Sequence, residues 1–191
     1  MDVRFRPMRP KDIGKGAEHL AQHPILGPRY GKVLEHFPSA VSRVLGQDAL
    51  TVVVFEEFHD STDRFLGVGM PAFVGDDFLR EVKTTPSFWI APELVKRIVR
   101  GQSPLLSNAE VRNANSTVGL NLVVWHDSPH PEDMRRAEVG TAAMNAFEEN
   151  YRGFQLREAI GQADCLEHLY AMENAGGLYF NRSGGSYERF P

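Results

Sequence analysis

An apolar segment in the second half of the chain constrains the fold more than any other part of the sequence. Residues 118–125 read Val-Gly-Leu-Asn-Leu-Val-Val-Trp, a nearly continuous apolar run that is typical of a strand buried on both faces. Two prolines follow, and small and apolar residues then recur at helical spacing over about 132–151. Residues 154–160 resume as a strand. The unit therefore predicts a parallel pair of strands joined by a right-handed helical crossover.

Shorter strand and helix patterns alternate along the rest of the chain. Further strands are expected at residues 3–8, 50–55, 65–74, 178–180 and 187–190. Helices are expected at residues 10–22, 29–45, 77–82 and 92–100, after Ser107, which has capping-box spacing to Glu110, and from 164 onward. The two strands around the polar residues 59–63 most simply form an antiparallel hairpin. The sum predicts an α/β (α+β) domain whose mixed sheet is antiparallel early and parallel around residues 118–160.

Composition narrows the class of protein. The length of 191 residues favours one domain, and the net charge of −4 argues against a nucleic-acid partner, which needs a basic face. The single cysteine, Cys165, excludes an internal disulfide and a cysteine-rich zinc site, and it fits a reducing compartment. No signal-like apolar segment opens the chain, and no run approaches the ~18 apolar residues of a membrane span. We therefore expect a soluble, cytoplasmic protein that has no membrane partner.

A candidate site lies between the end of the 118–125 strand and the start of the following helix. Helix starts offer unpaired backbone N–H groups and a partial positive charge, and Arg135 and Arg136 add two cations that could hold a phosphate or pyrophosphate. Glu132, Asp133 and Glu138 equally suit an ordinary helix start that binds no ligand. The residues alone leave both interpretations open and favour the ordinary helix.

Three segments carry a resemblance to a known family. Residues 3–12 contain an Arg-Pro pair and a later Asp where the first helix is expected to begin. Residues 135–141, Arg-Arg-Ala-Glu-Val-Gly-Thr, follow the strand that ends at Trp125, and the pair Leu169-Tyr170 precedes two glycines. This order of elements resembles the GNAT superfamily of acyl-CoA-dependent N-acyltransferases. The pyrophosphate loop of that family reads (Gln/Arg)-x-x-Gly-x-(Gly/Ala), and its late helix ends in Leu-Tyr.

The resemblance implies a fold, a reaction and a set of site residues. It implies one GNAT-like domain over residues 1–191, with residues 76–117 as a helical insertion. It implies an acetyl-CoA or other acyl-CoA co-substrate, a small-molecule or peptide amine as acceptor, and a homodimer that pairs through sheet edges or the C-terminal strands. Tyr170 would protonate the leaving thiolate. The cofactor-binding positions of the family fall on Val124, Trp125, Arg135, Arg136, Val139, Gly140 and Thr141.

Glu138 departs from the family pattern. It occupies the first glycine position of the loop, where a side chain blocks close approach of the backbone and a carboxylate repels a pyrophosphate. Gly140 keeps the second glycine position. Two functions follow: an acyltransferase in which Arg135 and Arg136 compensate for Glu138, or a GNAT-like domain that has lost the co-substrate and serves as a ligand-binding or interaction module.

The remaining candidates concern the general base and a metal. Glu56 and Glu57 at the end of one strand, and His126 at the end of another, are the candidates for a base that accepts the amine proton. His126, Asp127 and His130 are metal-ligand types and define a third possibility, a metal-dependent enzyme. An exposed polar turn is the favoured interpretation of these three residues, so no metal site is expected.

Overall fold

A computed structural model shows one mixed sheet, with the strand order β1-β2-β3-β4-β5-β7-β6 among the described residues. It describes residues 2–24, 26–59, 62–85, 88–127, 133, 137–162, 178–181 and 186–189. The strands are β1 (Asp2–Pro7), β2 (Val53–His59), β3 (Thr62–Val74), β4 (Leu120–Asp127), β5 (Leu156–Gln162), β6 (Leu178–Asn181) and β7 (Ser186–Arg189). Neighbouring strands are antiparallel except β4 and β5, which are parallel. The expected fold class is confirmed.

The β2–β3 hairpin extends further than its apolar pattern indicates. The sequence predicts a strand over 50–55 and a polar loop over 59–63, whereas β2 begins at Val53 and β3 already begins at Thr62. Leu50 instead forms an isolated bridge with Ala72. The polar end of the hairpin is stable in strand form because Glu56 and Glu57 find arginine partners on β1 and β3. A pattern of apolar residues does not predict cross-strand charge pairing of this kind.

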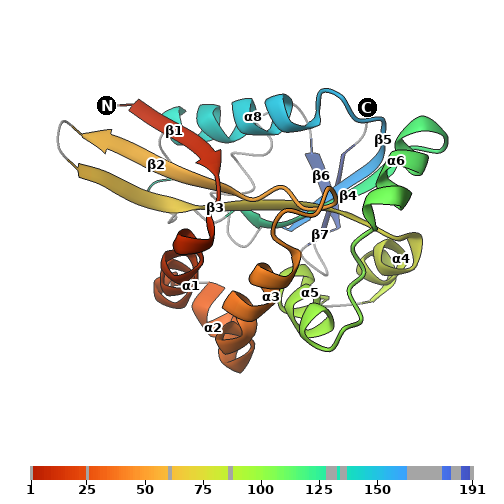
Figure 1. The fold of residues 1–191 in the computed structure, drawn as a ribbon, viewed down its shortest axis with the longest axis horizontal. Helices are drawn as coiled ribbons and strands as arrows, with labels where there is room; N and C mark the ends of the chain where they lie inside the picture. Colours follow the sequence, from red (N-terminus) through yellow and green to blue (C-terminus); the bar gives the residue numbers. More distant parts are fainter. Residues whose placement is uncertain are drawn as a thin grey trace.

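Helices cover both faces of the sheet (Figure 1). The helix α8 (Ala137–Tyr151) lies on one face. The other face carries η1 (Pro10–Asp12), α1 (Ile13–Gln22), α2 (Leu26–Tyr30), η2 (Gly31–His36), α3 (Phe37–Val44), α4 (Asp76–Thr84) and α5 (Ile90–Val99). The helix α6 (Asn108–Ser116) lies at the end of the sheet where α8 finishes. No helix in the described parts of the chain combines the length and the apolar character needed to cross a bilayer.

The largest apolar cluster lies between the sheet and the helices from α1 to α5. Phe37, Val68 and Met70 are fully buried there, at the meeting of α3 with β3. From α5, Ile90 and Leu94 are also fully buried in the same cluster. Residues 76–117 therefore contribute helices to the main core. They do not form a separate lobe, because α5 packs directly against α3 and β4.

The helix boundaries that depend on a capping box or on a glycine after the helix agree with the sequence prediction. The Ser107–Glu110 capping box is present: Oγ of Ser107 accepts from the Glu110 N–H at 3.3 Å, and the Ser107 N–H donates to Oε2 of Glu110 at 2.7 Å. Gly101 follows α5 with a φ of +75°, as expected of a glycine just past a helix. The helix expected over 29–45 is divided into α2, η2 and α3, and α8 begins at Ala137, later than residue 132.

Candidate functional site

β4 and β5 pair over part of their lengths, and their described register ends before β4 does. Their parallel register ends at the pair Val124 and Gly161, whereas β4 continues to Asp127. On its other side β5 still pairs with β7, up to Gln162 opposite Ser186. The backbone of β4 beyond Val124 therefore has no β5 partner in the described register. Because backbone groups need hydrogen-bonding partners, this edge of β4 is the candidate place for a ligand.

A bulge in β4 lies at the same level. Gly69 of β3 opposes Asp127 and Pro71 opposes Val124, so three steps along β4 face two steps along β3. Trp125 falls within this bulge, and Pro71 has no N–H to donate across it. A bulge leaves one residue unpaired and bends its strand. The β4 backbone is thus irregular on the β3 side at the point where it leaves β5. We call this region the β4–β5 divergence.

The opposite ends of the two strands are tied together by polar side chains. Asn121, which is 4% exposed, donates Nδ2 to Oδ1 of Asp76 at 2.6 Å and accepts from Nε of Arg157 at 3.0 Å. Arg157 also pairs with Asp76. The Asn121 hydrogen bond, with help from Arg157, holds the pKa of Asp76 below its usual value. The network therefore links β4, β5 and the start of α4 at this end of the strands.

The start of α8 packs over β1 and β2. Val139 is fully buried in an apolar cluster with Val53, Phe55 and Leu66. Its side chain is therefore a core group, and a ligand would reach only its backbone. Gly140 and Thr141 follow Val139 within α8, in helical conformation. Val124 is half-buried at the divergence.

An arginine anchors the chain leading into α8. Nη2 of Arg64 donates to Oδ2 of Asp133 at 3.0 Å, and Nη1 donates to Oε2 of Glu57 at 3.4 Å. Asp133 and Glu57 are 5% and 2% exposed, whereas the Arg64 side chain is 57% exposed. Two buried carboxylates are thus held by one cation at the surface. Arg64 connects the β2–β3 hairpin to the segment that precedes α8.

Several expected site residues lie outside the part of the chain that the structure describes. These are Arg135, Arg136 and Tyr170. For Trp125 and Thr141 only the backbone position is described. Their assignments as cofactor-binding or catalytic residues stay predictions.

A charged hollow of about 260 Å³ lies on the α1 side of the sheet, away from the α8 face. Four basic residues line it: Arg6, Arg9, Lys11 and Lys15. Three carboxylates, on Asp12, Glu56 and Asp63, and the ring of Phe65 complete the lining. The sequence analysis did not find this site. A signal was present in the density of basic residues over positions 4–15, which the chain's acidic total conceals.

Arg6 joins two of these carboxylates into an ion triad. Its Nε and Nη2 donate to Glu56 at 2.9 and 2.7 Å, and its Nη1 donates to Oδ2 of Asp12 at 2.6 Å. The Arg6 hydrogen bond lowers the pKa of Asp12 from 3.8 to about 2, and the backbone N–H of Arg9, 2.8 Å from Oδ2, contributes in the same direction. The same two carboxylates, Asp12 first, raise the pKa of Arg6. The triad ties β1, β2 and the start of α1 together.

The three candidate bases have different surroundings. Glu56 belongs to the Arg6 triad, and Glu57 is buried beside Arg64 on the α8 face. Each carboxylate therefore already accepts hydrogen bonds from a guanidinium. His126 lies on β4 beside the bulge, and its position makes it the base candidate nearest to the divergence.

No group of three His, Cys, Asp or Glu side chains capable of holding a metal ion occurs among the described residues. Of the residues considered for a metal, His126 and Asp127 are placed on β4 by their backbone, and His130 lies outside the described part of the chain. Comparison with protein-family models and with curated proteins finds no match. Function must therefore be argued from the geometry of this chain.

Proposed function

We propose that this protein is an N-acyltransferase that transfers an acyl group, acetyl in the simplest case, from acyl-CoA to an amine of a small molecule or peptide. The observation that supports it is the β4–β5 divergence, where the described parallel pairing ends at Val124 while β4 continues to Asp127. Crevices beyond the carboxyl ends of parallel strands are preferred ligand sites. The strand order and the helix between β4 and β5 agree with the resemblance drawn from the sequence.

The residues of the divergence suit the amide-containing arm of coenzyme A. That arm carries amide donors and acceptors, and the free edge of β4 beyond Val124 offers complementary backbone groups. Arg135 and Arg136 would hold the phosphates by charge-assisted hydrogen bonds, and the N–H groups at the start of α8 would add to them. The fit is good along β4 and is opposed at Glu138, whose position in the first turn of α8 is described.

The reaction asks the protein mainly to position two groups and to move two protons. The amine nitrogen forms a bond to the thioester carbonyl carbon, the carbon–sulfur bond breaks, and the thiolate leaves with the electron pair. His126 is the candidate that would accept the amine proton, and Tyr170 would donate a proton to the thiolate sulfur. Holding the amine against the thioester supplies most of the acceleration, because the thioester is already activated.

A second function, a GNAT-like ligand-binding or interaction module, is favoured by one specific observation. Glu138 lies in the first turn of α8, where a carboxylate stabilises the helix start without any ligand. The next residue, Val139, is fully buried, which fixes the orientation of that turn. In this module Glu138 would neutralise the partial positive charge at the start of α8, and the co-substrate would not bind.

Binding of acetyl-CoA discriminates between the two functions. For the transferase, acetyl-CoA raises the melting temperature of the wild-type protein, and a concentration 100 times the Kd adds about 2.7 kcal/mol to the free energy of unfolding. Glu138→Gln removes the charge at constant size and is expected to tighten binding. Glu149→Gln, an exposed position on the same helix, is the matched control and leaves the Kd unchanged.

Two outcomes of the binding measurement and one further assay are informative. Binding only by the Glu138→Gln variant supports the module, since the geometry is intact and the charge alone prevents binding. Absence of binding by both proteins, measured by calorimetry at millimolar acetyl-CoA, contradicts the acyltransferase proposal. Where binding occurs, release of free thiol in the presence of a panel of small amines and peptide N-termini tests transfer itself.

A further inference from the structure

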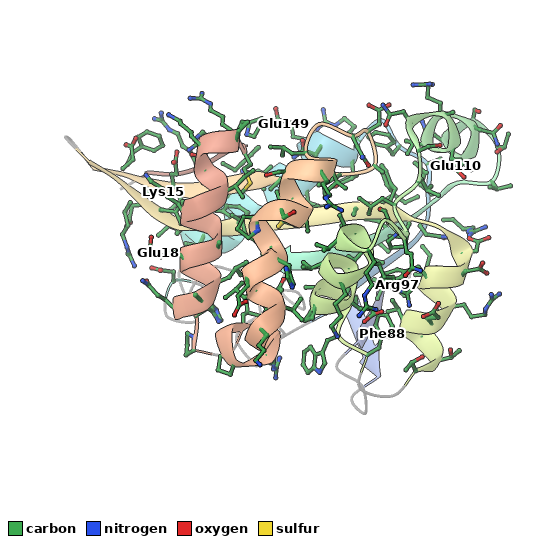
Figure 2. The ribbon with its side chains drawn as sticks, turned by 60° about the horizontal axis from the view of Figure 1, so that its bottom comes forward. Lys15, Glu18, Phe88, Arg97, Glu110 and Glu149 are labelled. Carbon is green, nitrogen blue, oxygen red and sulfur yellow. The ribbon has the colours of Figure 1, made fainter. Side chains whose placement is uncertain are left out.

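The charged hollow beside α1 has no part in the proposed acyltransferase site. It is built from β1, β2, β3 and the η1–α1 segment, whereas the acyl-CoA predictions fall on β4, α8 and residue 170. Figure 2 shows Lys15, together with Glu18, on the flank of α1 that faces away from α3. The hollow therefore lies between that flank and the end of the sheet formed by the first three strands. Its volume of about 260 Å³ is large enough for a small organic molecule.

Both carboxylates of the ion triad are paired with Arg6, and the triad as a whole carries a net charge of −1. Asp12 and Glu56 both accept hydrogen bonds from Arg6, and their side chains are 4% and 14% exposed. Asp12 also accepts from the Arg9 N–H. The donors to these two carboxylates are therefore Arg6 and, for Asp12, also the backbone N–H of Arg9. The triad holds three of the lining side chains in place beside the other charged residues of the hollow.

Three further cations line the hollow outside the triad. Arg9, Lys11 and Lys15 are exposed, and among the described residues none of them forms an ion pair as short as those of the triad. Lys11 and Lys15 are four residues apart in the η1–α1 segment, a spacing at which like charges destabilise a helix. A bound anion would relieve that repulsion. It would also lie near the start of α1, where the helix dipole favours negative charge.

Charge and shape together define the ligand. Outside the triad the hollow is lined by three cations, Arg9, Lys11 and Lys15, and one carboxylate, Asp63, which together carry +2, and all eight lining residues together carry +1. A phosphate monoester has a charge between −1 and −2 near neutral pH and three acceptor oxygens. The half-buried ring of Phe65 supplies an apolar wall for an organic substituent. We propose that this hollow binds a phosphate monoester, its phosphate held by Arg9, Lys11 and Lys15 and its organic part against Phe65.

The test uses the full chain with two probes, inorganic phosphate and phenyl phosphate, titrated by calorimetry at constant ionic strength. Phenyl phosphate is expected to bind with the lower Kd, because only it reaches the Phe65 ring. Arg9→Gln and Lys15→Gln are each expected to raise that Kd about fivefold, the loss of one charge-assisted hydrogen bond at an exposed site. Lys32→Gln, an exposed lysine that does not line the hollow, removes the same charge and should leave the Kd unchanged.

Protection of lysines provides a second measurement that does not depend on any variant. Acetylation by a soluble active ester, followed by peptide mass spectrometry, should slow at Lys11 and Lys15 when phenyl phosphate is present and proceed equally at Lys32. Failure of both probes to bind, or an equal loss of affinity in all three variants, would overturn the proposed site. Equal affinity for the two probes would overturn the assignment of an ester. Because neither probe requires acyl-CoA, these results stand whether or not the acyltransferase proposal holds.

Discussion

Replacing Asp12 by Asn should destabilise the protein in a manner that depends on pH. Asp12 is 3% exposed and accepts from Arg6 and from the Arg9 N–H, so its ionised form is favoured in the folded protein. The substitution keeps the size of the side chain and one acceptor oxygen but removes the charge. Arg6 retains its two hydrogen bonds to Glu56. The variant therefore isolates the contribution of one ionised carboxylate to the triad.

The magnitude follows from the pKa of Asp12, about 2 in the folded protein against its usual 3.8. That difference corresponds to ~2.4 kcal/mol. Because Arg6 is 26% exposed, solvent screening reduces the expected effect to about 1–2 kcal/mol. The folded pKa is the lower one, so the unfolded chain takes up the proton first as the solution is acidified. The stabilisation is complete above about pH 5 and is lost as the pH falls through 4 toward 2.

Urea unfolding at pH 7, 5, 3.5 and 2.5 measures the effect. The wild type should exceed the Asp12→Asn variant by about 1–2 kcal/mol at pH 7, and the difference should shrink toward zero at the lowest pH. Asp77→Asn is the matched control: its side chain is 86% exposed and pairs with Arg80 on the same helix, so a loss below about 0.5 kcal/mol is expected. A difference for Asp12 that is constant from pH 7 to 2.5 would refute the linkage between its charge and stability.

Two further predictions concern local backbone chemistry. Ser107→Ala removes the α6 capping box and should lower the free energy of unfolding by about 1 kcal/mol in urea titrations; a loss near zero would show that α6 is stabilised by packing alone. Gly119 (φ +84°) and Gly101 (φ +75°) share a left-handed conformation, but a Cβ at Gly119 would lie 3.1 Å from Cβ of Arg157, whereas at Gly101 it would meet open space. Gly101→Ala should cost about 1 kcal/mol and Gly119→Ala about 2–3 kcal/mol, and equal melting temperatures for the two variants would contradict this difference.

Features that depend on neighbours in the sequence were predicted closely. The Ser107–Glu110 spacing gave the start of α6, and the glycine at 101 gave the end of α5. The apolar run at 118–125 predicted that β4 lies in the middle of the sheet. A strand that is buried on both faces lacks the alternation of apolar and polar residues seen in a strand with one exposed face. The β2 boundaries were predicted poorly. Glu56 and Glu57 look like a strand end in the sequence, and only Arg6 and Arg64 from other strands keep them inside the sheet.

The two candidate sites also differ in whether neighbouring residues in the sequence or distant residues form them. A helix start after a buried strand is a local pattern, so the position of the β4–β5 divergence was predicted from residues 118–160 alone. The hollow beside α1 depends on side chains from three strands and the η1–α1 segment, which are separated by up to 59 positions along the chain. No spacing rule connects Lys15 to Asp63 or Phe65, and their proximity results from the register of β1, β2 and β3.

By itself the sequence determined most of the described helices and strands, the parallel pair at the centre of the sheet, and the cap of α6, because these follow from backbone hydrogen bonding and the period of apolar residues over short stretches; the helix expected from residue 164 onward lies outside the described residues. Only the tertiary structure decided which charges neutralise each other. It directed Arg6 to two carboxylates, placed Val139 in the core, and brought three exposed cations near the start of α1 to one hollow. Electrostatic energy depends on distance in space, and distance in space is set by how the strands are paired.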